Sequence, residues 1–331
     1  MAAPYLYETI IIGRQRTLIS LCITLMHSEN KGENPSSGSH PLGWYTKRLD
    51  FAARDSGDMF LNSLAEAIRY LPNLTMFNFN PHGYVSSSLY STFSSVARAL
   101  ADTCGLNLRQ LNFSRHCLQE SDWQVLLSST PNLLAFHSTD TLAGIPLLRD
   151  SAAAQLTNLR SLIILPEHGH MRPWRHTHSF SDLRHLELAS CEAANQLSVK
   201  TTPIPVRALY LHIRRRYDYP GQWPDIEKHF PNVSRLSFFL DEWNALPLEV
   251  PPPVTHLALH CRRPQAKSGT FSYVFRVLTT LKSSRLKVVR FADRRVGEEL
   301  RTRHPAILEE GLRRIRLACS FVLEDYEGRP F

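Results

Sequence analysis

Hydrophobic residues recur along the chain in a six-residue frame that is apolar at its first, fourth and sixth positions. The segment Leu183-Arg-His-Leu-Glu-Leu188 shows this frame clearly, and Cys191 comes three residues after it. Alternation of apolar and polar residues in the second half of the frame predicts a short strand with one buried face. The same spacing begins at Leu74, Leu108, Leu159, Val206, Val233, Val254, Leu286 and Leu312, with weaker copies at Thr46 and Leu133.

Between the frames, the spacing of apolar residues changes to that of a helix. Leu61, Leu64 and Ile68, for example, fall on one helical face. The segment Ser121-Asp-Trp-Gln124 indicates a capping box that opens another helix. Most frames return after about 20 to 29 residues, which is the period of leucine-rich strand-helix repeats.

One such repeat is too small to bury its own leucines, so we expect neighbouring repeats to stack into one continuous core. The predicted fold class is α/β, a curved leucine-rich-repeat solenoid (horseshoe) of about eleven or twelve irregular repeats. Parallel strands are expected on the concave face, with helices and loops on the convex face. Curvature is expected because helices pack about 10 Å apart and strands about 4.8 Å apart.

The sequence predicts four consecutive parts. Residues 1–27 form a strand-helix cap, whose strand is expected from Tyr5 to Ile12. Residues 28–41 form a polar loop, and residues 42–320 form the solenoid. Residues 321–331 are predicted to be a C-terminal tail.

Composition narrows the functional classes. The 331 residues include 38 Lys plus Arg against 30 Asp plus Glu, and the net charge of +8 favours acidic partners or anionic surfaces. The 6 cysteines are scattered without a Cys-x-x-Cys pair, so we expect reduced, buried thiols. The longest apolar run, Thr17 to Met26, is too short for a membrane helix. We therefore predict an intracellular protein, cytoplasmic or nuclear, with no membrane partner.

Chemical signatures of enzymes and metal sites are weak. His168, His170, His176 and His178 lie close together, and paired imidazoles can ligate zinc or copper. Apart from Glu167, no cysteine or carboxylate stands near enough to complete a set of known spacing. The sequence also has no phosphate-loop, dinucleotide-binding, nucleophile-elbow or zincin motif. We predict no cofactor, no metal and no catalytic residue.

Residues on either side of the frame's middle leucine are expected to point to the concave face, because side chains alternate along a strand. This face is polar and mixed, and it carries tyrosine and arginine, which are enriched among interface anchors. The candidate partner-binding residues are Arg48, Gln110, His137, His185, Glu187, Tyr210, Arg235, His256, Arg290, Arg314 and Arg316.

The repeat pattern resembles leucine-rich-repeat proteins of the ribonuclease-inhibitor-like class over residues 46–317. The phrase from Leu118 to Leu133 is similar to the cysteine-containing variety found in F-box proteins. The opening from Ala3 to Ile10, with the run from Leu42 to Leu49, is similar to the segment after the F-box in fungal members. The resemblance implies a substrate-recognition adaptor of a cullin-type ubiquitin ligase. No Leu-Pro-x-Glu-Leu helix stands before the repeats, so we expect the ligase's linker subunit to bind only if an F-box is present upstream.

We therefore predict a non-catalytic protein-protein interaction module that meets a protein partner on its concave face. Two alternatives stay open, namely a basic-faced nucleic-acid or phosphate-ligand binder and an uncharacterised enzyme of a biosynthetic pathway. Protein is favoured over nucleic acid because acidic residues intersperse the basic segment around Arg290 and no series of stacking aromatics accompanies it.

Overall fold

The structure is a computed structural model in which the chain divides into two compact units, Met1–Asp182 and Leu183–Phe331. The residues that it describes are 7–32, 40–52, 58–80, 90–113, 118–139, 156–165, 180–188, 205–213, 227–247, 249–263, 267–281, 283 and 285–331.

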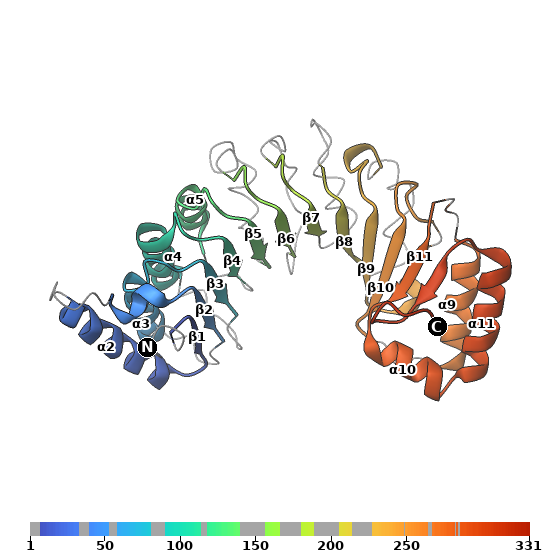
Figure 1. Ribbon diagram of the computed structural model, residues 1–331, viewed down its shortest axis with the longest axis horizontal. Coiled ribbons are helices and arrows are strands. Elements are labelled where there is room, and N and C mark those ends of the chain that lie inside the picture. The colour runs from blue at the N-terminus through green and yellow to red at the C-terminus, as the bar shows by residue number, and fades with distance from the viewer. Residues whose placement is uncertain are drawn as a thin grey trace. The chain divides into compact units, whose positions relative to one another are not determined.

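The first unit is a parallel sheet with helices packed on one face (Figure 1). Each strand pairs in parallel with the next strand in the sequence. Helices α2 to α5 pack side by side in chain order. The strands are β1 (Thr9–Ile12), β2 (Arg48–Phe51), β3 (Met76–Phe79), β4 (Gln110–Phe113), β5 (Ala135–Ser138) and β6 (Ser161–Ile164). The helices are α2 (Gln15–Gly32), η1 (Leu42–Tyr45), α3 (Asp58–Arg69), α4 (Tyr90–Cys104) and α5 (Glu120–Ser128).

Aromatic rings fill the core between this sheet and its helices. Phe51, Phe79 and Phe113 end successive strands and contact one another, with ring centroids 4.9 and 5.5 Å apart. Trp123 of α5 meets Phe113 edge to face at 5.1 Å. These side chains are at most 1% exposed. The in-register pairing thus places equivalent frame residues beside one another, which is how a repeat too small to have its own core acquires one.

Asparagine side chains tie the turns of the first unit together. Each donates its amide to a backbone carbonyl of the preceding turn, which satisfies an oxygen that the strand ladder leaves free. The bonds run from Asn73 to Trp44 (3.0 Å), Asn107 to Pro72 (2.9 Å), Asn132 to Leu106 (2.9 Å) and Asn158 to Pro131 (3.3 Å).

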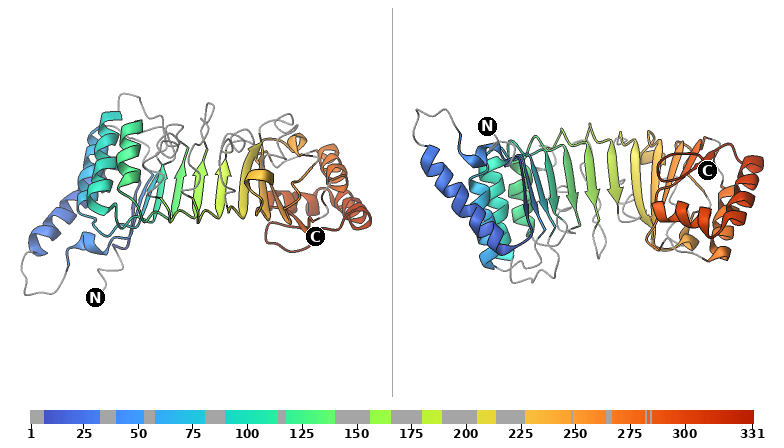
Figure 2. Two further views of the ribbon diagram at one scale, coloured as in Figure 1. Left: turned by 90° about the horizontal axis from the view of Figure 1, so that it is seen from above. Right: turned by 60° about the horizontal axis from the view of Figure 1, so that its bottom comes forward.

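The second unit is also built on a parallel sheet (Figure 2), and its strands β8, β9 and β10 are longer than those of the first unit, with 6 residues each. Its strands also pair in parallel and in chain order. They are β7 (His185–Leu188), β8 (Ala208–Ile213), β9 (Arg235–Leu240), β10 (His256–Cys261), β11 (Val288–Phe291) and β12 (Val322–Glu324). The helical elements are η5 (Trp243–Ala245), α9 (Ser268–Thr279), α10 (Arg294–Thr302) and α11 (Pro305–Ala318).

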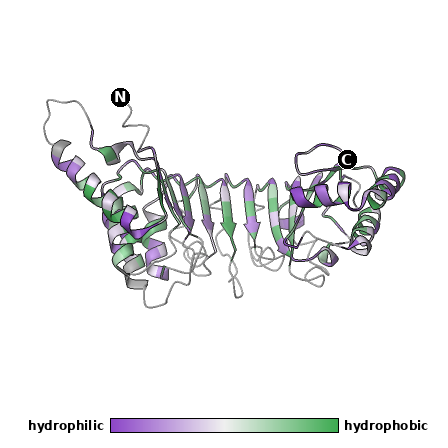
Figure 3. Cartoon of the chain, turned by 90° about the horizontal axis from the view of Figure 1, so that it is seen from below, coloured by the Kyte–Doolittle hydropathy of each residue, from purple (hydrophilic) through white to green (hydrophobic). Residues whose placement is uncertain are grey.

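Burial alternates along the strands in both units, and Figure 3 shows hydrophobic and hydrophilic residues mixed along them. Side chains on one face of the strands are buried, and those on the opposite face are half-buried or exposed, apart from the small Ser237 of β9. We call this second face the uncovered face. The predicted leucine-rich-repeat solenoid is therefore confirmed, and each frame from Thr46 to Leu286 contains a strand.

The frame predicted at Leu312 is wrong, because residues 305–318 form helix α11. Leu312 and Ile315 are three residues apart, a spacing that fits a helical face as well as the strand frame. Leu317, expected to be buried, is 76% exposed. The strand of this repeat is β12, which lies in the segment predicted to be a tail, and its Leu323 pairs with Val289 of β11.

Two predicted boundaries also differ from the structure. Helix α2 continues to Gly32, into the segment predicted as a polar loop, and the first strand begins at Thr9 in the described residues. The capping box is not at Ser121, as predicted, but begins at Gln119, the residue before α5. The backbone N–H of Gln119 donates to the carboxylate of Asp122 at 3.2 Å.

The C-terminal residues cover the outer edge of β12. The chain turns at Gly328, where φ is +81°, a conformation that favours glycine. The amide of Phe331 then donates to the carbonyl of Leu323 at 3.1 Å, and the amide of Asp325 donates to that of Arg329 at 2.9 Å. An edge strand whose backbone groups are occupied does not recruit another strand.

Candidate partner-binding face

The uncovered face of the second unit gathers most of the predicted site residues. Its strands present His185 and Glu187 on β7, Tyr210 on β8, Arg235 on β9, His256 on β10 and Arg290 on β11. In the described part of the second unit, no helix packs against this face (Figure 1). Arg235 and His256 are exposed on this face, and the other four side chains are half-buried.

Five rings on β7 to β10 stack across the strands, and we call His185, Tyr210, His212, Phe239 and His260 the ring cluster. His185 lies 4.4 Å from Tyr210 between ring centroids, with the two planes 7° apart. Phe239 is sandwiched between His212 at 4.6 Å and His260 at 4.3 Å. A hydrogen bond between His212 Nε2 and Glu187 Oε1, 2.8 Å long, holds the His212 ring in place.

Register explains the stacking. His212, Phe239 and His260 are direct partners on three adjacent parallel strands. Neighbouring strands lie about 4.8 Å apart, close to the separation of stacked rings, so ring planes that stand upright on the sheet meet face to face. All three side chains are half-buried, although no described helix covers them. Contact among the rings therefore accounts for part of their burial.

Burial also sets the charge of two rings. It lowers the pKa of His185, with the Glu187 carboxylate acting in the opposite direction. Burial likewise lowers the pKa of His260, more than the carboxylates of Asp293 and Glu187 raise it. Burial therefore favours the neutral form of both imidazoles.

Positive charge lies at the amino-terminal edge of the same strands. Arg207 stands one residue before β8, Arg235 begins β9, and Lys287 stands one residue before β11. All three side chains are exposed, and none has an ion pair or side-chain hydrogen bond within the residues that the structure describes. We call these three residues the cationic edge.

Arg290 differs from the cationic edge because it is already paired. Its Nη2 lies 2.7 Å from Glu324 Oε2, and its Nε donates to the same oxygen at 3.0 Å. A side chain at position 328 would collide with its guanidinium, so the C-terminal turn also confines it. Arg290 therefore contributes to the structure of the last strands more than to an open surface.

The first unit carries three predicted residues on its own uncovered face, Arg48, Gln110 and His137. Arg48 pairs with Asp50 at 2.9 Å, and Asn78 donates to Asp50 at 2.5 Å. Burial raises the pKa of Asp50, but hydrogen bonds from Arg48 and Asn78 outweigh it and hold the pKa below its ordinary value. Arg48, Asp50 and Asn78 thus form a hydrogen-bonded network, in which Asn78 Oδ1 is buried without a partner among the described residues.

Arg314 and Arg316 do not lie on the uncovered face. Both belong to α11, because the frame predicted there is a helix. Arg314 pairs with Glu310 of the same helix at 2.7 Å. Their assignment to the strand face is corrected, and Arg316 is an exposed helical residue.

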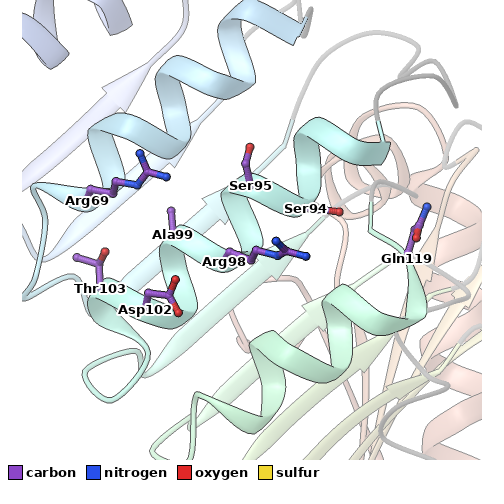
Figure 4. A pocket seen from close by; sticks show the side chains of 8 residues that line it. All are labelled: Arg69, Ser94, Ser95, Arg98, Ala99, Asp102, Thr103 and Gln119. Atoms are coloured by element: carbon purple, nitrogen blue, oxygen red, sulfur yellow. The ribbon is translucent and has the colours of Figure 1, made fainter.

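A hollow of about 670 Å³ lies on the helical side of the first unit, between α3, α4 and α5 (Figure 4). Its lining includes Arg69, Arg98, Asp102 and Gln119. Arg69 forms an ion pair with Glu66, with 2.6 Å between Arg69 Nη1 and Glu66 Oε2. Ser94, also in the lining, donates to Asp122 at 2.6 Å, so its hydroxyl joins α4 to α5.

Metal-ligating side chains do not cluster in the described part of the chain. There, no group of three or more His, Cys, Asp or Glu is arranged to hold a metal ion. The segment with His168, His170, His176 and His178 lies outside the described residues. Among the helices that the structure describes, none has the length and apolar character to cross a bilayer.

Sequence reasoning missed His212, Phe239 and His260. The six-residue frame ends at Leu211, Phe238 and Leu259, whereas β8, β9 and β10 each continue two residues further. The missed signal is continued alternation, because the next buried residues after the rings are Ile213, Leu240 and Cys261.

Strand pairing and the burial of frame residues define the chain as a leucine-rich-repeat fold. No family model matches the sequence, and no curated protein matches it. The chain is similar to a crystal structure of the Rad7 and Elc1 complex in yeast, with 14% identity, 87% of each chain covered and a TM-score of 0.32. It is also similar to a crystal structure of the TLR13–ssRNA13 complex, with 14% identity, 87% of this chain and 52% of that chain covered, and a TM-score of 0.26.

Proposed function

We propose that this chain is a non-catalytic protein-interaction module that binds a protein partner on the uncovered face of its second unit. The observation that carries the proposal is the ring cluster, in which Phe239 stands half-buried on a face that no described helix covers. Aromatic residues and arginine are enriched among the residues that anchor protein interfaces, and this face carries both.

The arrangement suits binding better than chemistry. His212 and Glu187 are paired, and His185 stacks on Tyr210. Among the described residues, no serine or cysteine side chain forms a hydrogen bond with these histidines, as an activated nucleophile would. A rigid strand scaffold with pre-ordered rings instead lowers the conformational cost of binding.

Site-specific photocrosslinking tests the proposal. A photoreactive phenylalanine analogue in place of His256, an exposed residue that pairs with Arg235 and lies on the same strand as His260, is expected to capture a defined protein in cell extract. The matched control carries the analogue at Leu317, which is 76% exposed on α11. The captured protein is then purified and its affinity is measured with the wild type and with Tyr210→Ala.

We expect Tyr210→Ala to weaken that affinity by about tenfold or more, as loss of an interface anchor does. The proposal is wrong if positions 256 and 317 capture the same proteins. It is equally wrong if the purified protein binds the wild type and the Tyr210→Ala variant alike.

The finer role that we propose is substrate recognition for a ubiquitin ligase, in the cytoplasm or nucleus. It is supported by the resemblance of residues 118–133 to the repeats of F-box proteins. An adaptor of this kind shortens the life of its partner, so depletion of the chain should lengthen the partner's half-life in a chase experiment. An unchanged half-life would leave protein binding in place and remove the adaptor role.

A further inference from the structure

We propose that the segment bound on the uncovered face of the second unit is an acidic polypeptide stretch carrying an aromatic or large apolar side chain. The inference rests on the proposed function and adds the chemistry of the partner. Its carboxylates would meet the cationic edge, and its apolar side chain would meet the ring cluster.

Unpaired charge is the first argument. The cationic edge, Arg207, Arg235 and Lys287, has no acidic partner among the described residues. Several other arginines of the second unit are paired with carboxylates of the fold, namely with Glu242, Glu298, Glu310, Glu324 and Asp325. Three exposed cations without carboxylate partners, at the amino-terminal ends of β8, β9 and β11, favour a negatively charged segment.

Spacing is the second argument. Arg235 and Phe239 lie on the same strand, four residues apart and on the same face. At a rise of about 3.3 Å per residue, their Cα atoms are about 13 Å apart. An extended peptide spans this distance with about four residues. A single short segment can therefore reach both the cationic edge and the ring cluster.

Ring orientation favours a peptide over nucleic acid. Sequence-tolerant binding of single strands relies on bases that stack on free aromatic faces. Both faces of Phe239 are occupied, because His212 and His260 stack on it with planes 9° and 16° from parallel. The free parts of Phe239 are ring edges, whose positive partial charge suits the face of an incoming aromatic side chain or a carbonyl oxygen.

Selection from a library of short random peptides displayed on phage tests the inference, using the full 331-residue chain as bait. Enriched peptides are synthesised, and their affinities are measured by fluorescence anisotropy. We expect enrichment of Asp and Glu together with Trp, Tyr or Phe. We also expect the affinity to fall as salt is raised, because exposed charge pairs are screened.

Charge reversal then locates the bound peptide. The double variant Arg207→Glu/Arg235→Glu is expected to bind about tenfold more weakly or worse, since it turns attraction into repulsion. Arg316→Glu is the matched control, because Arg316 is exposed on α11 and should leave the affinity unchanged. Phe239→Leu reports on the ring cluster and should also weaken binding.

The results distinguish a failure of the acidic-partner inference from a failure of the proposed protein-binding face. Neutral or basic peptides that depend on Phe239 and ignore the charge reversal would overturn the acidic partner and leave the protein-binding face intact. Selected peptides that ignore both changes would overturn the face as well. Tighter binding of labelled oligothymidylate than of the best peptide, with loss on charge reversal, would replace the peptide by nucleic acid and overturn the inference.

Discussion

The guanidinium of Arg301 and the carboxylate of Asp325 form an ion pair in which Arg301 Nη2 lies 2.8 Å from Asp325 Oδ2. Asp325 directly follows β12 and its side chain is fully buried. Backbone amides of Glu327 and Arg329 donate to its other oxygen at 3.0 Å each. Asp325 comes one residue after Glu324, the partner of Arg290, so it occupies the position that Phe291 holds in the preceding repeat. The last repeat thus ends on a hydrogen-bonded carboxylate in place of an apolar residue.

Removal of this ion pair should destabilise the C-terminal repeats. Arg301→Gln removes the nearer of the two cations on the buried carboxylate and leaves only Arg329, whose Nε lies 3.4 Å from Asp325 Oδ2. Weakening a buried pair is costlier than the loss of an exposed pair. We expect a lower urea midpoint by circular dichroism at pH 7. The control is Arg294→Gln, which breaks the exposed pair with Glu298 and should change the midpoint little. Equal midpoints for the two variants would contradict a special role for Asp325.

The same carboxylate predicts a pH dependence. The hydrogen bond from Arg301 lowers the pKa of Asp325 from 3.8 to about 2, with further help from the amides of Arg329 and Glu327. The folded pKa lies below the unfolded value, so this group stabilises the fold above pH 3.8 and loses that effect as the pH falls towards 2. We expect Asp325→Asn to be less stable than the wild type at pH 7, and the difference to shrink between these pH values. A difference that stays constant with pH would contradict the assignment.

Asn132, which joins the turns of β4 and β5, should contribute measurably to the stability of the protein. Asn132 donates to the carbonyl of Leu106 at 2.9 Å, and Asn132→Ala leaves that oxygen without its side-chain donor. We expect a loss of about 1 kcal/mol in the free energy of unfolding, the usual net value of one hydrogen bond. Asn62→Ala, at an exposed position on α3, is the control and should not destabilise the protein. A loss in both variants of the same size would mean that the bond is not the cause.

Truncation of a side chain in the aromatic core of the first unit should lower the stability of the protein strongly. Phe79 is 0% exposed and contacts both Phe51 and Phe113, so Phe79→Ala opens a cavity among rings from three strands. We expect a loss of about 3 to 5 kcal/mol by urea unfolding. Met76 lies on the same strand and is 37% exposed, so Met76→Ala should cost about 1 kcal/mol or less. Similar losses for both would argue against the core position of Phe79.

Two cysteines should resist alkylation in the native protein. Burial raises the pKa of the Cys104 thiol to about 12 and that of Cys261 to about 11. The thiolate is the reactive form, so iodoacetamide at pH 8 should label both residues slowly, as peptide mass spectrometry can show. Unfolding in urea should restore normal labelling. Rapid labelling of the folded protein would contradict their burial.

Much of the fold was predictable because its signal is local and repeated. The apolar spacing around Leu186, Leu209 and Leu257 marks strands whose alternate residues are buried, and the structure has those strands. The same alternation placed Tyr210 and Arg235 on the uncovered face. The site was predictable to the extent that a residue's face follows from its place in the frame.

The spacing of apolar residues alone could not distinguish a strand from a helix where both structures give the same spacing. Leu312 and Ile315 satisfy both the strand frame and a helical face, and packing of α11 against α9 decides for the helix. At the end of the chain, Asp325 occupies a core position that no hydrophobic pattern marks. Its burial is possible because Arg301, far from it in sequence, and the turn after β12 supply the hydrogen bonds.

The sequence by itself determined the kind of repeat, the strands from Thr46 to Leu286 and the alternation of their faces, because these depend on residues close together in the chain. Tertiary structure alone decided which polar residues are already paired and which remain open. It placed Glu324 on Arg290, stacked His212 and His260 on Phe239, and left the cationic edge unpaired among the described residues. Register between neighbouring strands sets these contacts, and register is fixed by the packing of whole repeats.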